Sequence, residues 1–178
     1  LLILMDGVYF LEQHIHNDNN PPQISQIQPP MHFPSPKNPN QQQHRTLLQV
    51  VLVQDKDNVP RFMVQDILAH NGGILTGKPW KQRFAFWMEG VLQLKKKVPP
   101  KQNEKIKLRA IEFFKVSQFQ HVWSNVCPVV LHETDGIVWI PTEATFQNRE
   151  EPCLIMRKNS LQNEATRLNV LNHLQPFS

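Results

Sequence analysis

The chain has 178 residues, of which 40% are hydrophobic and 19% are charged, and its formal net charge is +4. This length supports one domain with a hydrophobic core and is too short for two well-buried cores. No segment approaches the roughly 20 consecutive apolar residues that cross a bilayer, so we expect no membrane anchor. Cys127 and Cys153 are too few for a disulfide framework and are expected to be buried thiols.

The first residues predict a β-hairpin, because apolar runs at residues 1–5 and 8–11 flank an Asp-Gly pair that is typical of tight turns. A strand at the very start indicates a piece of a longer protein, and without a secretory signal we expect it to be intracellular. Residues 17–43 are rich in Pro, Asn and Gln, which predicts a partly disordered loop. Within it, Met-His-Phe-Pro at residues 31–34 is expected to dock two apolar side chains on the domain.

Residues 46–54 and 61–68 predict two strands of an antiparallel hairpin, joined by a polar turn at residues 55–58. Asn-Gly-Gly at residues 71–73 then interrupts the chain. Residues 80–97 predict a helix over one sheet face, with apolar side chains at helical spacing that we expect to pack in the core rather than stack on a ligand. These side chains are Trp80, Phe84, Trp87, Met88, Val91 and Leu92.

The excess positive charge gathers between residues 95 and 109. It is carried by Lys95, Lys96, Lys97, Lys101, Lys105, Lys107 and Arg109. Because cations favour helix C-termini, the preferred interpretation is a solvated helix end, and polyanion binding is the alternative.

The remaining segments predict short elements. Residues 108–116 have strand composition, and residues 119–126 predict a short helix that ends before Pro128. A strand is expected at residues 136–141, another at Cys153 after a loop, and a helix or exit segment at the end of the chain. We therefore predict one partial α+β domain over residues 1–178, with a mostly antiparallel sheet packed by helices.

Five segments, in this order, resemble known motifs. Residues 1–11 resemble the hairpin that follows a Lys-x-Asp-Gly-x-Arg-Tyr motif, and residues 31–34 resemble the next landmark. Residues 46–55 resemble Thr-Leu-Leu-Asp-Gly-Glu, residues 61–68 resemble Arg-Tyr-Leu-x-Tyr-Asp, and residues 132–138 resemble Ser-His-Glu-x-Asp-Gly-Leu-Ile. Together they resemble the nucleotidyltransferase domain of eukaryotic messenger-RNA capping enzymes, which are guanylyltransferases related to DNA ligases and have an ATP-grasp-like domain. We expect the family's C-terminal OB-fold domain to be absent from this chain.

The resemblance implies a chemistry. In that family a lysine attacks the α-phosphate of GTP, Mg²⁺ offsets the phosphate charge, and GMP passes to a diphosphate RNA end. GTP and Mg²⁺ are thus the implied cofactors. The implied partners are the RNA 5′ end or its cap and the RNA polymerase II machinery, and the implied localisation is nuclear. Without the resemblance we expect a cytoplasmic protein.

The resemblance also implies a set of site residues, none of them catalytic. The nucleotide-binding candidates are Phe62, Asp66, Gly136, Val138, Arg157 and Lys158, and the metal-binding candidate is Asp135. Three of them have a structural alternative. Asp66 would bond to backbone at a strand end, Arg157 would pair with Glu133 or Glu151, and Val138 would belong to the core.

Several functional positions of the family are changed. The nucleophilic lysine's motif is expected before Leu1, and residues 49–51 read Gln-Val-Val where the family has Asp-Gly-Glu. Ile155 stands at the first of two phosphate-binding lysines, with Arg157 at the second or Lys158 after a one-residue slip. Residues 116–119 read Val-Ser-Gln-Phe instead of Val-Arg-x-Lys.

Three functions follow from this pattern. One is a divergent, catalytically impaired guanylyltransferase paralogue. Another is a non-catalytic module that holds a guanine cap, as the cap-binding domain of snurportin does, with the base between Trp139 or Phe62 and an apolar strand and with Arg157 on phosphate. The third is a decayed copy without a ligand.

Overall fold

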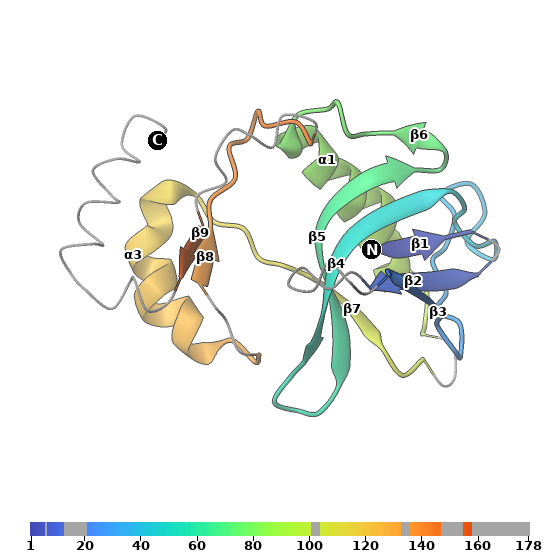
Figure 1. Cartoon of the computed structure of the whole chain (residues 1–178), viewed down its shortest axis with the longest axis horizontal. Helices are drawn as coiled ribbons and strands as arrows, with labels where there is room; N and C mark the ends of the chain where they lie inside the picture. Colours follow the sequence, from blue (N-terminus) through green and yellow to red (C-terminus); the bar gives the residue numbers. More distant parts are fainter. Residues whose placement is uncertain (6, 13–20, 101–103, 133–135, 147–154, 158–178) are drawn as a thin grey trace.

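The computed structural model describes residues 1–5, 7–12, 21–100, 104–132, 136–146 and 155–157. It has the predicted α+β architecture, with a large sheet covered on one face by a helix and a separate two-stranded sheet beside a second helical segment (Figure 1). None of the described helices is long and apolar enough to cross a membrane.

The large sheet is mixed but mostly antiparallel. Its strand order is β3-β2-β1-β4-β5-β6, and β7 pairs with β5 in parallel. Its strands are β1 (Leu2–Leu4), β2 (Val8–Glu12), β3 (Gln23–Gln26), β4 (Thr46–Gln54), β5 (Pro60–His70), β6 (Gly73–Ile74) and β7 (Lys107–Ala110).

The predicted N-terminal hairpin is confirmed. Strands β1 and β2 are antiparallel, with Leu2 opposite Phe10 and Leu4 opposite Val8. Leu2, Leu4 and Val8 are fully buried, so one face of this hairpin belongs to the core.

The prediction of a partly disordered loop at residues 17–43 is wrong for much of its described part. Strand β3 lies inside it and pairs with β2, because a proline-free stretch between two Pro-Pro pairs leaves its backbone N–H groups available to the β2 edge. All four β3 residues are exposed, so the strand is held by backbone bonds rather than by burial. The docking of residues 31–34 is confirmed, since Met31 and Phe33 are 2% and 0% exposed.

The second predicted hairpin, of β4 and β5, is also confirmed. Its register shifts between Leu47 and Leu48 and between Gln49 and Val50. The turn places Asn58 at φ 59°, and the break after β5 uses Asn71 at φ 49° and Gly72 at φ 88°. Asn and Gly tolerate this left-handed backbone better than other residues, which explains why these positions end the strands.

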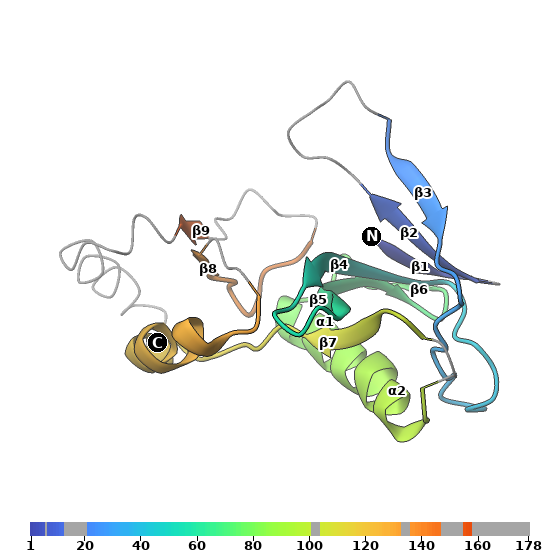
Figure 2. The same ribbon diagram turned by 90° about the horizontal axis from the view of Figure 1, so that it is seen from below.

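The helix predicted at residues 80–97 is continuous, although its middle is not α-helical. It comprises α1 (Trp80–Trp87), a π-helical segment (Met88–Gln93) and α2 (Leu94–Lys97). Figure 2 shows the helix along one face of the large sheet. Trp87, Val91 and Leu92 are buried there against the strands, which confirms that the apolar stripe is core.

The second helical segment consists of four short pieces. These are a 3₁₀ turn (Val116–Gln118), α3 (Phe119–His121), a π-helical segment (Val122–Val126) and a 3₁₀ turn (Cys127–Val129). The two-stranded sheet is formed by β8 (Gly136–Val138) and β9 (Ile155–Arg157). Phe119 is 1% exposed and packs with Trp123, Ile137 and Trp139 in a small core of its own.

Four sequence predictions need correction here. The helix does not stop before Pro128, because proline is tolerated in the first turn of the following 3₁₀ segment. The strand expected at residues 108–116 ends at Ala110, where its pairing with Val64 of β5 ends. The strand expected at residues 136–141 likewise ends early, because β8 and its pairing with β9 end at Val138. Cys127 is half-buried rather than buried, since the small core offers little cover; Cys153 lies outside the described residues.

The basic cluster is not one helix end. Lys95, Lys96 and Lys97 do form the last turn of α2, as predicted. Lys105, Lys107 and Arg109, however, lie along β7 and the residues before it, because this segment adds to the edge of β5.

Candidate nucleotide-binding site

The small sheet brings three candidate residues together. Gly136 of β8 is directly opposite Arg157 of β9, and Val138 is opposite Ile155. The Val138 side chain is 51% exposed, so it is not a core residue. Asp135 and Lys158, the residues next to this pair in the sequence, lie outside the described residues.

Phe62 and Asp66 belong to β5, in the other sheet. The ring of Phe62 is fully buried, and its centroid lies 5.2 Å from that of Phe10. In this arrangement no face of Phe62 is open to a base. Its contact with a nucleotide stays a prediction that requires movement of the core.

Asp66 forms a buried ion pair with Arg83 of α1. Arg83 Nη2 is 2.7 Å from Asp66 Oδ2, and Arg83 Nε is 2.9 Å from Asp66 Oδ1. The backbone N–H of Ile67 also donates to Oδ1, at 2.8 Å. Asp66 and Arg83 are only 7% and 3% exposed, so both carboxylate oxygens are committed to the fold. A role for Asp66 in nucleotide binding stays a prediction.

Arg83 also holds the segment that returns from the small sheet. Its Nη1 donates to the carbonyls of Lys78 at 2.5 Å and Ala144 at 3.1 Å. The backbone N–H of Trp80 donates to Ala144 O at 2.8 Å as well. The Asp66–Arg83 pair therefore anchors residues 142–146 at the start of α1, and these residues follow the candidate strand β8.

A second anchor involves Asp55, which the sequence analysis did not single out. Asp55 is 2% exposed, and Arg61 Nη1, His132 Nδ1 and Arg109 Nη1 lie 2.5, 3.3 and 3.8 Å from its oxygens. Arg61 is the nearest of the three, so the charges of Arg61 and Arg109 stabilise the buried carboxylate. The backbone N–H of Lys56 donates to Leu131 O at 2.7 Å.

This Asp55 anchor docks the β4–β5 turn on the residues that lead into β8. A hollow of about 490 Å³ opens beside it. Its lining residues are Val53, Gln54, Asp55, Lys56, Leu131 and His132. In the sequence, the place of His132 in the Asp-Gly motif was the one indication of a role at this site. No local pattern indicated that His132 lies beside Asp55.

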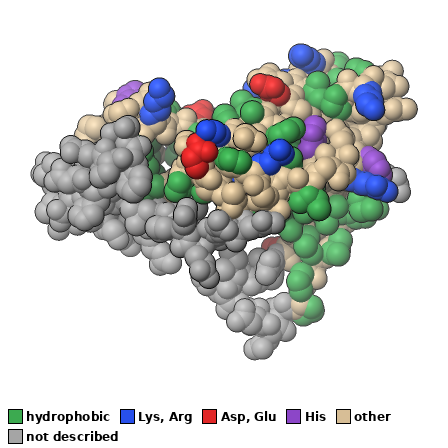
Figure 3. Space-filling view, turned by 90° about the horizontal axis from the view of Figure 1, so that it is seen from above, with side chains coloured by type: hydrophobic (Ala, Val, Ile, Leu, Met, Phe, Trp, Pro, Cys, Tyr) green, Lys and Arg blue, Asp and Glu red, His purple; other side chains and the backbone are tan. Residues whose placement is uncertain are grey.

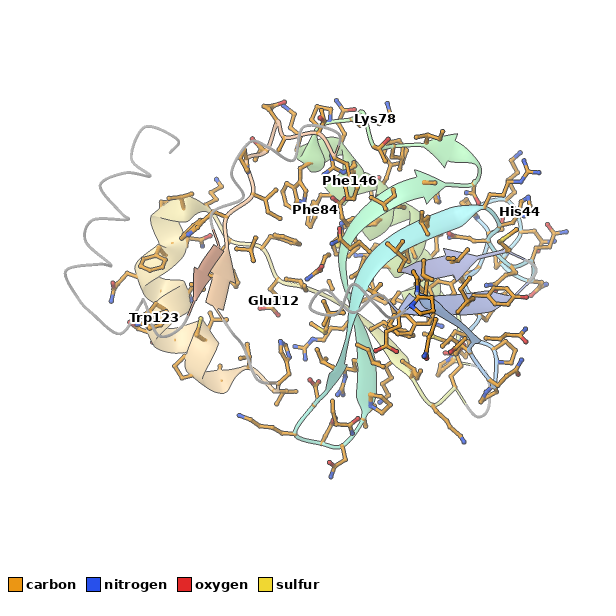
Figure 4. The ribbon with its side chains drawn as sticks, viewed as in Figure 1. His44, Lys78, Phe84, Glu112, Trp123 and Phe146 are labelled. Carbon is orange, nitrogen blue, oxygen red and sulfur yellow. The ribbon has the colours of Figure 1, made fainter. Side chains whose placement is uncertain are left out.

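A third connection is the linking segment at residues 111–115. The ring centroid of Phe113 lies 4.7 Å from that of Trp80 and 5.4 Å from that of Phe84, both on α1. Figure 4 shows Glu112 on this segment, between the two sheets, and Phe146 close to Phe84 near the start of α1. The two sheets are thus joined at both ends of β8 and through the linker.

The β4 positions that correspond to Asp-Gly-Glu alternate between the sheet faces. Val50 is 9% exposed and belongs to the core, whereas Val51 is 41% exposed on the opposite face. Gln49 is paired in register with Asp66, on the same side of the sheet as that residue. An amide and a hydrocarbon therefore occupy the face that carries carboxylates in the family.

The described residues do not fit a magnesium site. Mg²⁺ prefers carboxylate oxygens, and no group of three or more His, Cys, Asp or Glu side chains gathers among the described residues. Asp66 cannot serve without giving up Arg83. Asp135, the one metal candidate, falls outside the described part of the chain.

Trp139 follows β8 and was a candidate for stacking on a base. Its ring lies 5.6 Å from that of Phe119 and is half-buried in the small core. This packing gives the tryptophan a structural role, and a second role in base stacking stays a prediction.

A mostly antiparallel sheet under a helix, tethered to a second small sheet, is consistent with a domain of the nucleotidyltransferase type. The model of the mRNA capping enzyme catalytic domain matches residues 2–159, so the chain belongs to this family. The resemblance noted in the sequence is thereby confirmed. Family membership indicates a guanylyltransferase-type function that concerns GTP and the 5′ end of RNA. No curated protein matches the chain in sequence.

Proposed function

We propose that this chain binds a guanine nucleotide, as GTP or as the 5′ cap of an RNA, and is impaired in magnesium-dependent GMP transfer. The observation that carries the proposal is the outer face of β4, where Gln49 and the exposed Val51 replace two carboxylates. Removing one charge contact to a transferring group commonly costs about 10² to 10³ in rate. Losing the metal-side carboxylates therefore affects catalysis more than binding.

The small sheet supports retained binding. Val138 offers an exposed apolar side chain, and the backbone of Arg157 lies opposite Gly136. Val138 can make an apolar contact with a base, and a guanidinium suits phosphate recognition. Neither interaction needs a metal ion. This favours the cap-binding module over an active enzyme as the more specific form of the proposal.

Partners and localisation follow from the same family. We propose a nuclear protein that works on RNA 5′ ends alongside the RNA polymerase II machinery. Nuclear enrichment of the tagged chain in cells is the expected result, and fluorescence microscopy checks this localisation.

Thermal unfolding with GTP, with a methylated cap analogue, and with each plus Mg²⁺ tests the proposal, because a ligand that binds the folded state raises the melting temperature. We expect a shift with at least one guanine ligand that does not depend on Mg²⁺. Val138→Asp removes it, whereas Val129→Asp, a matched change at a 69% exposed position in the second helical segment, keeps it. No shift on a cooperatively folding chain contradicts the proposal.

A second readout addresses catalysis. Incubation of the chain with Mg²⁺ and labelled GTP, followed by denaturing electrophoresis, is expected to give no labelled band, and a covalent guanylate adduct overturns the claim of impairment. Gln49→Asp with Val51→Glu returns carboxylates to one sheet face. We expect this double variant to make the GTP shift depend on Mg²⁺.

A further inference from the structure

Strand β7 and the residues before it are amphipathic. Ile106, Leu108 and Ala110 pack against the main core. The alternating positions are cationic, and successive side chains of a strand point to opposite faces. We call Lys105, Lys107 and Arg109 the β7 cation row. Lys105 and Lys107 are exposed, and the Arg109 side chain is 41% exposed.

The lysines of this row contribute little to the fold: hydrogen bonding by Arg61 lowers the pKa of Asp57, and the charge of Lys107 adds only a small share. Within the described residues neither Lys105 nor Lys107 forms an ion pair, in contrast to Lys95, which is bound by Glu104 at 2.9 Å. Arg109 Nη1 is 3.8 Å from a carboxylate oxygen of Asp55, whereas Arg61 Nη1 is nearer, at 2.5 Å. Lys107 and Arg109 therefore lie on one strand about 6.6 Å apart, twice the rise per strand residue, and Lys105 precedes the strand, before a bend at Ile106.

The cation row is linked in register to the outer face of β4, where the family has Asp-Gly-Glu. In register, Arg109 lies beside Met63 of β5, and Met63 lies beside Val51 of β4. Paired residues in neighbouring strands share a sheet face, and strands are about 4.8 Å apart, so Arg109 is two strands from the position where the family has a metal-side carboxylate. From Arg109 the row runs back along β7 and the residues before it to Lys105.

The cations on one other face of the molecule are arranged differently. On the face shown in Figure 3, lysine and arginine side chains are scattered among other side chains and acidic groups. A row of cations linked to the outer face of β4 suits a polyanion with regularly spaced charges better than it suits a single ion.

We infer that the β7 cation row binds backbone phosphates of the RNA that follows the 5′ end. The identity of the polyanion as RNA rests on the proposed function. The site on the small sheet would hold the terminal guanine, and the row would hold the nucleotides next to it. Such contacts are sequence-independent and weaken with salt.

The test uses a labelled single-stranded RNA of about 12 nucleotides with a 5′-hydroxyl, so that no cap or triphosphate contributes. Lys105→Glu with Lys107→Glu is compared with Lys96→Glu with Lys97→Glu, which makes the same charge change at exposed lysines of α2. We expect the β7 variant to lose about tenfold or more in affinity, and its plot of log K against log salt to flatten by about 1.4, the value for two phosphate contacts on a single strand. The α2 variant should lose less than about threefold.

Equal losses in both variants, an unchanged salt slope, or no binding by the unaltered chain overturn the inference. Equal competition by polyglutamate of matched charge also overturns it, since the row would then recognise acidic polymers generally. Circular dichroism confirms that each variant folds. The thermal shift with cap analogue, measured on the same variants, separates the two proposals. Its absence with RNA binding intact refutes only the proposed function, and its presence without a β7 effect refutes only the cation row.

Discussion

Asp66 and Arg83 show how a residue of a nucleotide-binding motif can serve the fold. Taking two charges out of water is costly, and the cost is offset here by two short hydrogen bonds between them and a third from the backbone of Ile67. Removing one partner leaves the other charge buried without compensation. The pair also anchors Ala144, so the effect reaches the segment after β8.

We predict that Asp66→Asn lowers the free energy of unfolding by about 3–5 kcal/mol, measured by urea denaturation. Glu143→Gln, which breaks the exposed pair with Lys81, should cost less than about 1 kcal/mol. Adding Arg83→Met to Asp66→Asn should recover part of the loss by removing the unpaired guanidinium. The structural role of the Asp66–Arg83 pair is contradicted if Asp66→Asn lowers the free energy of unfolding no more than Glu143→Gln does. It is also contradicted if adding Arg83→Met lowers that free energy further.

Among the elements, the π-helical segment Met88–Gln93 connects the long helix to a distant part of the chain. Gly90 O accepts a hydrogen bond of 2.6 Å from Gln43 Nε2, a buried side chain that also donates to Pro34 O. A wider helical turn frees a carbonyl for such a bond. The segment thereby ties the helix to the described part of the loop that precedes β4.

Gly90 also permits the approach of His70. A Cβ at this position would lie 2.8 Å from His70 Cε1, closer than atoms normally approach. Gly90→Ala gains about 1 kcal/mol in helix propensity but costs about 1–3 kcal/mol in overpacking, so we predict net destabilisation. In a His70→Ala background the same change should stabilise, because only the propensity remains. Chemical denaturation of the four proteins of this cycle tests it, and equal effects in both backgrounds would refute the clash.

At the scale of the whole molecule, the β4–β5 turn and the residues before β8 are held together by the Asp55 anchor. Asp55 is buried beside Arg61 and His132, and the Lys56 amide is bonded to Leu131 O. The attraction to His132 is an ion pair only when the imidazole is protonated. This contact fixes the start of the candidate strand relative to the large sheet.

We predict that Asp55→Asn weakens this docking and speeds hydrogen exchange at the Lys56 amide by about tenfold or more, as expected for a segment that opens locally. Asp57→Asn is the matched control, because Asp57 is 46% exposed and pairs with Arg61 on the surface. Exchange measured by mass spectrometry on peptides that cover the turn should distinguish the two. Similar rates in both variants would mean that the backbone bond alone holds the turn.

Residue patterns along the chain predicted the two hairpins, the helix at residues 80–97, the docking of Met31 and Phe33, and the family. These depend on local periodicity, turn residues and the order of motifs, all of which are readable along the chain. Three features became visible only once the elements were packed together: Asp66 pairs with Arg83, Asp55 lies beside His132, and Lys107 and Arg109 lie on a strand parallel to β5. Such pairings join residues far apart in the sequence, and they depend on how whole elements pack, which no local pattern encodes.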